Sequence, residues 1–191
     1  MNARTIVGTV APVVGWFVIA LPPGSRLLES TMTSHMLVQL PLLVGGGWWL
    51  GGRLVMARAR KSAVLRVFRW ALLVTAVGTL ALWMIPRLLD LAVEARTVDA
   101  GKALSLAVLA GMPLRWCWSL SGPVVRGLLQ VEALASCWRL GWLYLESPDR
   151  LCRQYRFNDQ LQLGQLLLVV GTVYAVWLAW NALRETPQTE R

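Results

Sequence analysis

The stretch around the single histidine combines residue types that bind soft metal ions. Met32, His35, Met36 and Gln39 follow the spacing i, i+3, i+4, i+7, which places their side chains on one face of a helix. Thioether sulfur and imidazole nitrogen together form a ligand set that suits Cu(I). The same spacing is also typical of a packed helix face, where methionine fills space. The residues therefore allow either a copper site or ordinary packing.

Two further polar stretches lie beside apolar segments. Pro86 should begin a new short helix along the outer membrane surface, because proline lacks an N–H and disturbs the preceding turn. On that helix Arg87 and Asp90 share one face. Asp159 precedes the last apolar segment, where its carboxylate could cap the helix, and Gln160 follows it. A solvated face and a helix cap are sufficient explanations for these residues.

Polar residues interrupt the apolar segment 124–145 at Gln130, Glu132 and Arg139. Ionisable groups at membrane depth are costly and usually face a bundle interior or a partner. Glu132 and Arg139 are seven residues apart, so they can share a helix face. We expect them to hold this helix to another helix or subunit, with pairing inside the same bundle as the alternative.

The chain lacks the residue sets that most enzymes need. One histidine without a base–nucleophile set argues against hydrolysis, and no glycine-rich phosphate loop is present. The three cysteines are widely spaced and form no CxxC pair, which argues against a zinc or thioredoxin-like centre. The net charge of +9 does not indicate nucleic-acid binding, because the basic residues are not spread over a solvated face with interleaved aromatics. We therefore expect a protein that is not an enzyme.

Long apolar segments dominate the chain and must position these residues. Each is about long enough to cross a hydrocarbon core of about 30 Å, and each is apolar on all sides. We expect an all-α, polytopic membrane bundle of about six transmembrane helices over residues 1–183, followed by a short polar cytoplasmic tail over 184–191. The segments are Ile6–Leu21, Met36–Leu50, Trp70–Ile85, Ala103–Leu120, Val124–Leu145 and Leu161–Trp180.

The distribution of charge predicts how the bundle is oriented. The charged residues in the connection between the second and third segments are all basic. Short loops rich in Lys and Arg stay in the cytoplasm. This orientation places both termini in the cytoplasm, and Ser30 and Asp149 outside. In the outer connections the charges are expected to balance: Arg26 offsets Glu29, and Arg87, Arg96 and Lys102 offset Asp90, Glu94 and Asp99.

Taken together, three stretches resemble the CtaG-like membrane proteins, assembly factors of cytochrome c oxidase that are linked to copper delivery. Residues 34–39 resemble the family's helix that begins with a His-Met pattern. Residues 83–90 resemble its Trp-His-x-Pro-x-x-x-Asp stretch. Asp159 and Gln160, followed by Gly164, resemble the Asp-Gln pair that precedes a glycine and the final helix. The three stretches occur in the same order as in the family.

Most of the family's histidines are replaced in this chain. Gln39 stands at the second His of the first motif, and Met84 replaces the His beside Trp83. The later His positions fall around Asp99 and Lys102. The resemblance therefore implies either a decayed metal site on a persisting fold or a softer Cu(I) site. The ligands of that softer site would be Met32, His35, Met36 and Met84.

The resemblance also implies where the protein acts. It suggests a multi-pass protein of the bacterial inner membrane that assists assembly or stability of a haem-copper oxidase or another copper-dependent respiratory complex, and presents Cu(I) at the outer face. The alternative is a non-catalytic accessory subunit of a larger membrane complex. The expected partners are subunits of that complex and the lipid bilayer. The small residues Gly45–Gly47 and Gly51–Gly52 invite close approach of another helix, and with Glu132 and Arg139 would hold the chain in the complex.

Overall fold

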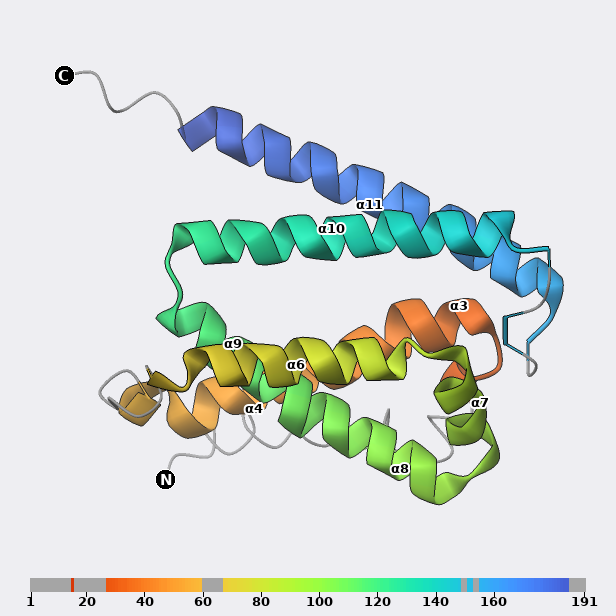
Figure 1. Ribbon diagram of the computed structural model, residues 1–191, viewed down its shortest axis with the longest axis horizontal. Coiled ribbons are helices and arrows are strands. Elements are labelled where there is room, and N and C mark those ends of the chain that lie inside the picture. The colour runs from red at the N-terminus through yellow and green to blue at the C-terminus, as the bar shows by residue number, and fades with distance from the viewer. Residues whose placement is uncertain (1–14, 16–26, 60–66, 149–150, 153–154, 186–191) are drawn as a thin grey trace. The chain divides into compact units, whose positions relative to one another are not determined.

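The computed structural model describes residue 15 and residues 27–59, 67–148, 151–152 and 155–185, with only the backbone described for 54–59 and 185. Within these ranges all regular structure is helical and no strand is present, which confirms the all-α prediction. Two of the helical stretches, η1 and η2, are π-helices (Figure 1). The elements are α3 (Met32–Ser34), η1 (His35–Gln39), α4 (Leu40–Ala59), α6 (Arg69–Trp83), α7 (Pro86–Glu94), α8 (Arg96–Ser105), η2 (Leu106–Gly111), α9 (Met112–Leu120), α10 (Pro123–Glu146) and α11 (Phe157–Glu185).

Two helices are long and apolar enough to cross a membrane. They are Arg96–Leu120, which joins α8, η2 and α9, and Phe157–Arg184. A third span results if α6 and α7 are counted together, although α7 bends away from α6 by 72°. Of the expected segment Ile6–Leu21, only residue 15 is among the described residues. A bundle of about six spans with both termini in the cytoplasm stays a prediction.

The chain divides into two compact units. The first comprises residues 1–121 and 152–155, and the second comprises residues 122–151 and 156–191. The single domain expected over residues 1–183 stays a prediction, and each unit is described by itself below.

In the first unit the long helix 96–120 packs against both α4 and α6. The helices approach closely because glycine occupies both sides of one contact. A Cβ atom on Gly47 would clash with the backbone of Ala107, and a Cβ on Gly111 would clash with the backbone around Val44. Gly51 similarly lies against the backbone of Met112. We had expected these small residues to face another subunit; Gly47 and Gly51 instead face a helix of the same chain.

Pro86 separates α6 from α7, as the sequence predicts. It occupies the first helical turn of α7, where its missing N–H needs no intrahelical partner. The indole Nε1 of Trp83 donates a hydrogen bond of 2.8 Å to Ser105 Oγ, which ties the end of α6 to α8. Trp83 is therefore buried inside the unit.

The second unit is an antiparallel pair of helices, α10 and α11 (Figure 1). Gly141 and Gly164 face each other, and a Cβ on either would lie 3.0 Å from the carbonyl oxygen of the other. The remaining surface of the pair is strongly apolar, as expected for helices in lipid. Large exposed apolar side chains include Val124, Leu128, Val131, Trp142, Val169, Val173, Val176, Trp177, Trp180 and Leu183.

Substitution of Gly47 by alanine should destabilise the first unit. The added methyl group has no room against Ala107, and overpacking of this kind costs about 1–3 kcal/mol. Gly45→Ala is the matched control, because nothing lies within 4 Å of its Cβ position and alanine favours a helix by up to about 1 kcal/mol. Thermal unfolding in mild detergent measures both variants. Equal melting temperatures for the two would contradict the close packing.

Candidate functional site

A cluster of three charged side chains is buried in the first unit. The Lys102 ammonium lies 2.9 Å from Glu29 Oε1 and 2.9 Å from Asp99 Oδ1. The Lys102 side chain is fully buried, and Asp99 is buried with it. Burial removes the hydration of each charge, which is tolerated only when opposite charges meet at close range. We refer to Glu29, Asp99 and Lys102 as the charge cluster.

Two distant segments supply the charge cluster. Asp99 and Lys102 are spaced i, i+3 on α8, so they share one helix face. Glu29 lies in the turn before α3. That turn is held in place because Thr31 Oγ1 caps α3 by accepting from the Ser34 N–H, and Ser34 Oγ donates to the Leu28 carbonyl at 2.5 Å. The ion pairs therefore connect the turn before α3 to α8.

His35 lies directly beside the charge cluster. Its Nδ1 is 4.0 Å from Glu29 Oε1, and the side chain is 1 % exposed. Gln39, one π-helical turn further, donates from Nε2 to the same Glu29 oxygen at 3.3 Å. The ring of Tyr155 lies 6.2 Å from the imidazole, centre to centre. Glu29 Oε1 thus lies near the Lys102 ammonium, the Gln39 amide and the His35 imidazole.

The protonation state of His35 follows from this setting. His35 precedes the expected span that begins at Met36. Burial, with a smaller contribution from the positive charge of Lys102, lowers its pKa from 6.5 to about 3, while Gln39 acts in the opposite direction. The imidazole is therefore neutral at physiological pH. Neither ring nitrogen makes a hydrogen bond of ordinary geometry within the described part of the chain.

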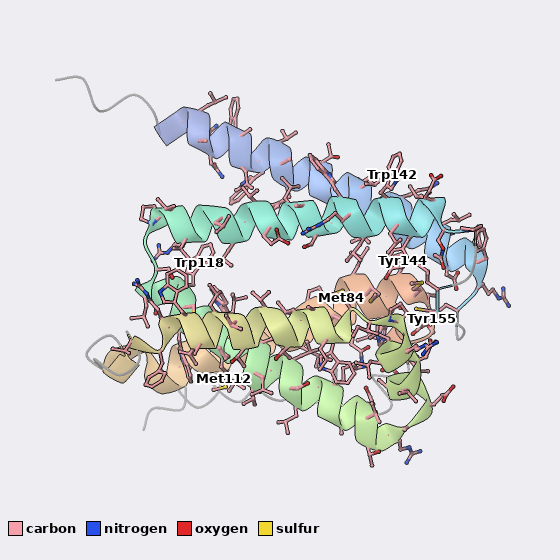
Figure 2. The ribbon with its side chains drawn as sticks, viewed as in Figure 1. Met84, Met112, Trp118, Trp142, Tyr144 and Tyr155 are labelled. Carbon is pink, nitrogen blue, oxygen red and sulfur yellow. The ribbon has the colours of Figure 1, made fainter. Side chains whose placement is uncertain are left out.

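The four candidate copper ligands lie on two parts of the first unit. Met32, His35 and Met36 are all buried on the face formed by α3 and η1, as their spacing predicts. Met84 caps the C-terminal end of α6 and is half-buried (Figure 2). Among the described residues, no group of three or more His, Cys, Asp or Glu side chains could hold a metal ion. The carboxylate oxygen nearest His35, Glu29 Oε1, already accepts hydrogen bonds from Lys102 Nζ and Gln39 Nε2.

The sequence predicts that Lys102 offsets Asp99 and that Arg26 offsets Glu29, all in outer connections. In the structure Lys102 does pair with Asp99, but it also pairs with Glu29, and α8, which begins at Arg96, buries Asp99 and Lys102. The signal that could have revealed them is the Asp–Lys pair at i, i+3 immediately before an apolar run. The resemblance also placed the family's later histidines near these two residues. Hydropathy alone could not indicate that Glu29, 73 residues from Lys102, would meet them.

Asp90 and Cys152 lie in another part of the first unit. Asp90 is half-buried on α7, within the electrostatic range of the buried Cys152 thiol. Burial, with a smaller effect of the Asp90 charge, raises the pKa of Cys152 to about 11. The thiol therefore stays protonated at neutral pH and is a poor nucleophile and metal ligand.

In the second unit, Gln160 joins the two helix ends. Its Nε2 donates to the Tyr144 carbonyl at 3.2 Å, and its Oε1 accepts from the Leu151 N–H at 3.0 Å. Asp159 lies in the first turn of α11 and is its third residue, not the residue that precedes the helix. Its charge is still placed at the positive end of the helix dipole. These two residues thus stabilise the loop between α10 and α11.

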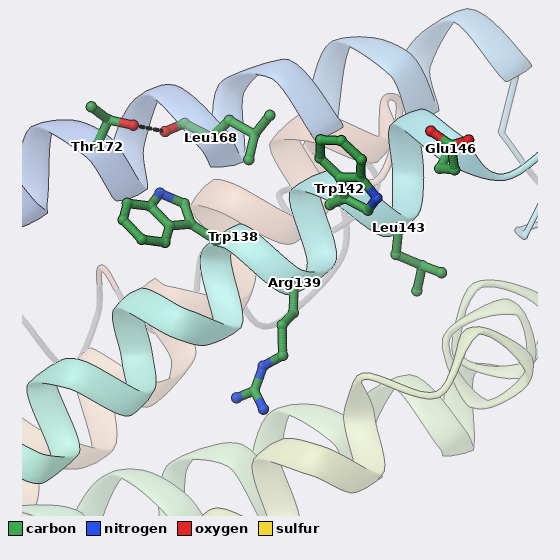
Figure 3. Close-up of a pocket in the computed structure, with 7 residues that line it drawn as sticks. All are labelled: Trp138, Arg139, Trp142, Leu143, Glu146, Leu168 and Thr172. Atoms are coloured by element: carbon green, nitrogen blue, oxygen red, sulfur yellow. Dashed lines mark hydrogen bonds between the residues drawn. The ribbon is translucent and has the colours of Figure 1, made fainter.

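Glu132 and Arg139 form an ion pair with each other along α10, and Ser136 bridges them. Their side chains are 57 % and 65 % exposed. They do not pair with the other helix of their unit. An open groove on the same unit is lined by residues of both helices, and Figure 3 shows Trp138 on the side of α10 that faces α11 while the Arg139 side chain extends away from α11. Its lining is Trp138, Arg139, Trp142, Leu143, Glu146, Leu168 and Thr172.

Comparisons of the chain with protein-family models, with curated proteins and with solved structures found no match. The resemblance to CtaG-like proteins therefore stays a prediction from the motifs alone.

Lys102→Met should destabilise the protein strongly. Methionine fills similar space but leaves the Glu29 and Asp99 carboxylates without their counter-ion, and breaking a buried pair costs about 3–5 kcal/mol. Arg96→Gln on the same helix is the control, since Arg96 is exposed. Thermal unfolding of the detergent-solubilised protein provides the measurement. A melting temperature unchanged from wild type would rule out the cluster as a stabilising contact.

Acid should weaken the folded state through His35. Its pKa is about 3 when folded and 6.5 in a model peptide, so the unfolded chain takes up a proton first as the pH falls. The stabilisation is complete above pH 6.5 and declines between that pH and about 3. The His35→Gln variant lacks this pH-dependent contribution to the free energy of unfolding. Wild type should lose up to about 1.4 kcal/mol per pH unit more than the variant. Parallel pH profiles for the two proteins would contradict a buried neutral imidazole.

Proposed function

We propose that this protein is a non-catalytic accessory protein of the bacterial inner membrane, which supports assembly or stability of a larger respiratory complex such as a haem-copper oxidase. The observation that carries this proposal is the buried Lys102 ammonium between Glu29 and Asp99. The resemblance assigns metal-ligand histidines near Asp99 and Lys102. In this chain a side-chain cation occupies that region, and its charge disfavours a metal cation close by.

The exposed surface of the second unit supports a role in association. The ion pair of Glu132 with Arg139 is exposed on α10, and if α10 lies in lipid each charge at the helix centre costs about 2.5–3.5 kcal/mol on insertion scales. Mutual pairing lowers this cost. A partner helix that covers the pair would lower it further and would also bury exposed side chains such as Val131 and Leu128.

A second candidate function is presentation of Cu(I) at the outer face. The observation that favours it is His35, a buried neutral imidazole whose nitrogens make no ordinary hydrogen bond, with Met32 and Met36 on the same buried face. Copper content per chain separates the two candidates. Metal analysis of the purified protein after copper loading should give about one Cu(I) in wild type and much less in His35→Ala if copper is presented. The accessory function predicts no bound copper in either protein.

Copurification tests the accessory function directly. The tagged chain should migrate on native gels with a larger membrane complex after mild-detergent extraction, and mass spectrometry should identify respiratory subunits in that band. Glu132→Leu should release the partner while membrane insertion stays normal, because it leaves Arg139 without its counter-ion on the exposed face. Val131→Leu, one residue away and also exposed, is the matched control. A stable monodisperse monomer without respiratory subunits would contradict the proposal.

A further inference from the structure

A compact pocket of arginine and tryptophan lies at the opposite end of helix 96–120 from the charge cluster. It has a volume of about 330 Å³ and is lined by Trp48, Trp49, Gly52, Arg53 and Arg115. The lining includes two guanidinium groups and no carboxylate. The function proposed above does not involve this pocket.

The two guanidinium groups are held by stacking on indole rings. Arg53 lies over Trp49 at 5.0 Å from the ring centre, and Arg115 of α9 lies over Trp48 of α4 at 5.3 Å. Gly52 gives Arg115 room to cross α4, because a Cβ there would lie 3.3 Å from Arg115 Nε. The N–H groups at the edge of a stacked guanidinium are the groups that bind phosphate.

Further contacts fix α9 against α4 beside the pocket. Trp116 Nε1 donates a hydrogen bond of 3.1 Å to the Gly51 carbonyl. The rings of Trp48 and Trp118 meet edge to face at 5.9 Å, and Figure 2 shows Trp118 at the end of α9. The pocket walls are therefore ordered by interactions within the first unit, which reduces the entropic cost of binding a ligand.

The charge around the pocket is of one sign. The sequence holds no acidic residue between Glu29 and Asp90, nor between Asp99 and Glu132. The elements that line the pocket, α4 and α9, belong to these two acid-free stretches. Indole rings are typical of the membrane–water interface, and basic pockets between helices bind anionic lipid head groups there.

We infer that Arg53 and Arg115, stacked on Trp49 and Trp48, bind the phosphate group of an anionic phospholipid such as cardiolipin or phosphatidylglycerol. The guanidinium edges donate hydrogen bonds to phosphate oxygens, and the indoles contact the glycerol and upper acyl region. The inference does not depend on the function proposed above, because the pocket shares no residue with the charge cluster or with α10.

Native mass spectrometry of the detergent-solubilised full chain tests this site. Cardiolipin, phosphatidylglycerol, phosphatidylcholine and inorganic phosphate are each added to wild type and to Arg53→Gln, Arg115→Gln and the double variant. We expect the anionic lipids to bind wild type more tightly than phosphatidylcholine, and affinity to fall about five-fold for each arginine removed. Arg96→Gln, at the other end of the same helix, should bind as wild type does.

The alternative outcomes are distinct. Equal binding of anionic lipid to wild type and the double variant would overturn the site. Binding of inorganic phosphate that is as tight as that of cardiolipin, and that both arginine variants lose, would overturn the lipid assignment. Arg53 is exposed on α4, so Arg53→Gln carries the test if Arg115→Gln does not fold. Circular dichroism and size-exclusion chromatography of each variant identify such a failure.

Discussion

The first unit depends on placing an ammonium group between two carboxylates where no water reaches it. A buried charge costs several kcal/mol in lost hydration, and only close, well-aligned partners compensate for that loss. Lys102 meets Glu29 and Asp99 at 2.9 Å each, so the cluster is stable only when α8 and the segment before α3 are both in place. This condition couples two parts of the chain that are distant in sequence. The positive charge of Lys102 also adds to the effect of burial, which keeps His35 neutral.

Close backbone approach complements this electrostatic contact. Gly47 and Gly111 let α4 and helix 96–120 meet without intervening side chains, and Gly141 and Gly164 do the same for α10 and α11. In lipid no hydrophobic effect drives helices together, so tight packing and polar contacts must hold them. The first unit uses a polar contact at one end of helix 96–120 and arginine–tryptophan stacking at the other.

Much of the local structure could be predicted from the sequence. The spacing of Met32, His35, Met36 and Gln39 predicts a shared buried face, and Pro86 predicts the break between α6 and α7. These features arise from short-range geometry. The burial of Lys102 could not be predicted, because it results from a contact across 73 residues and a balanced set of charges in solvent explains the same composition. For the same reason the sequence could not indicate that Gly47 faces helix 96–120 of its own chain.

Lys102 holds the buried polar site of the first unit together through its two carboxylate partners. A double-mutant cycle on Lys102→Met and Glu29→Gln measures this coupling directly through the free energy of unfolding in mild detergent. The account predicts that Glu29→Gln restores part of the stability lost in Lys102→Met, because it removes the carboxylate that the first substitution leaves unpaired; the coupling energy should exceed about 1 kcal/mol. The account is contradicted if the destabilisation of the double variant equals the sum of those of the two single variants.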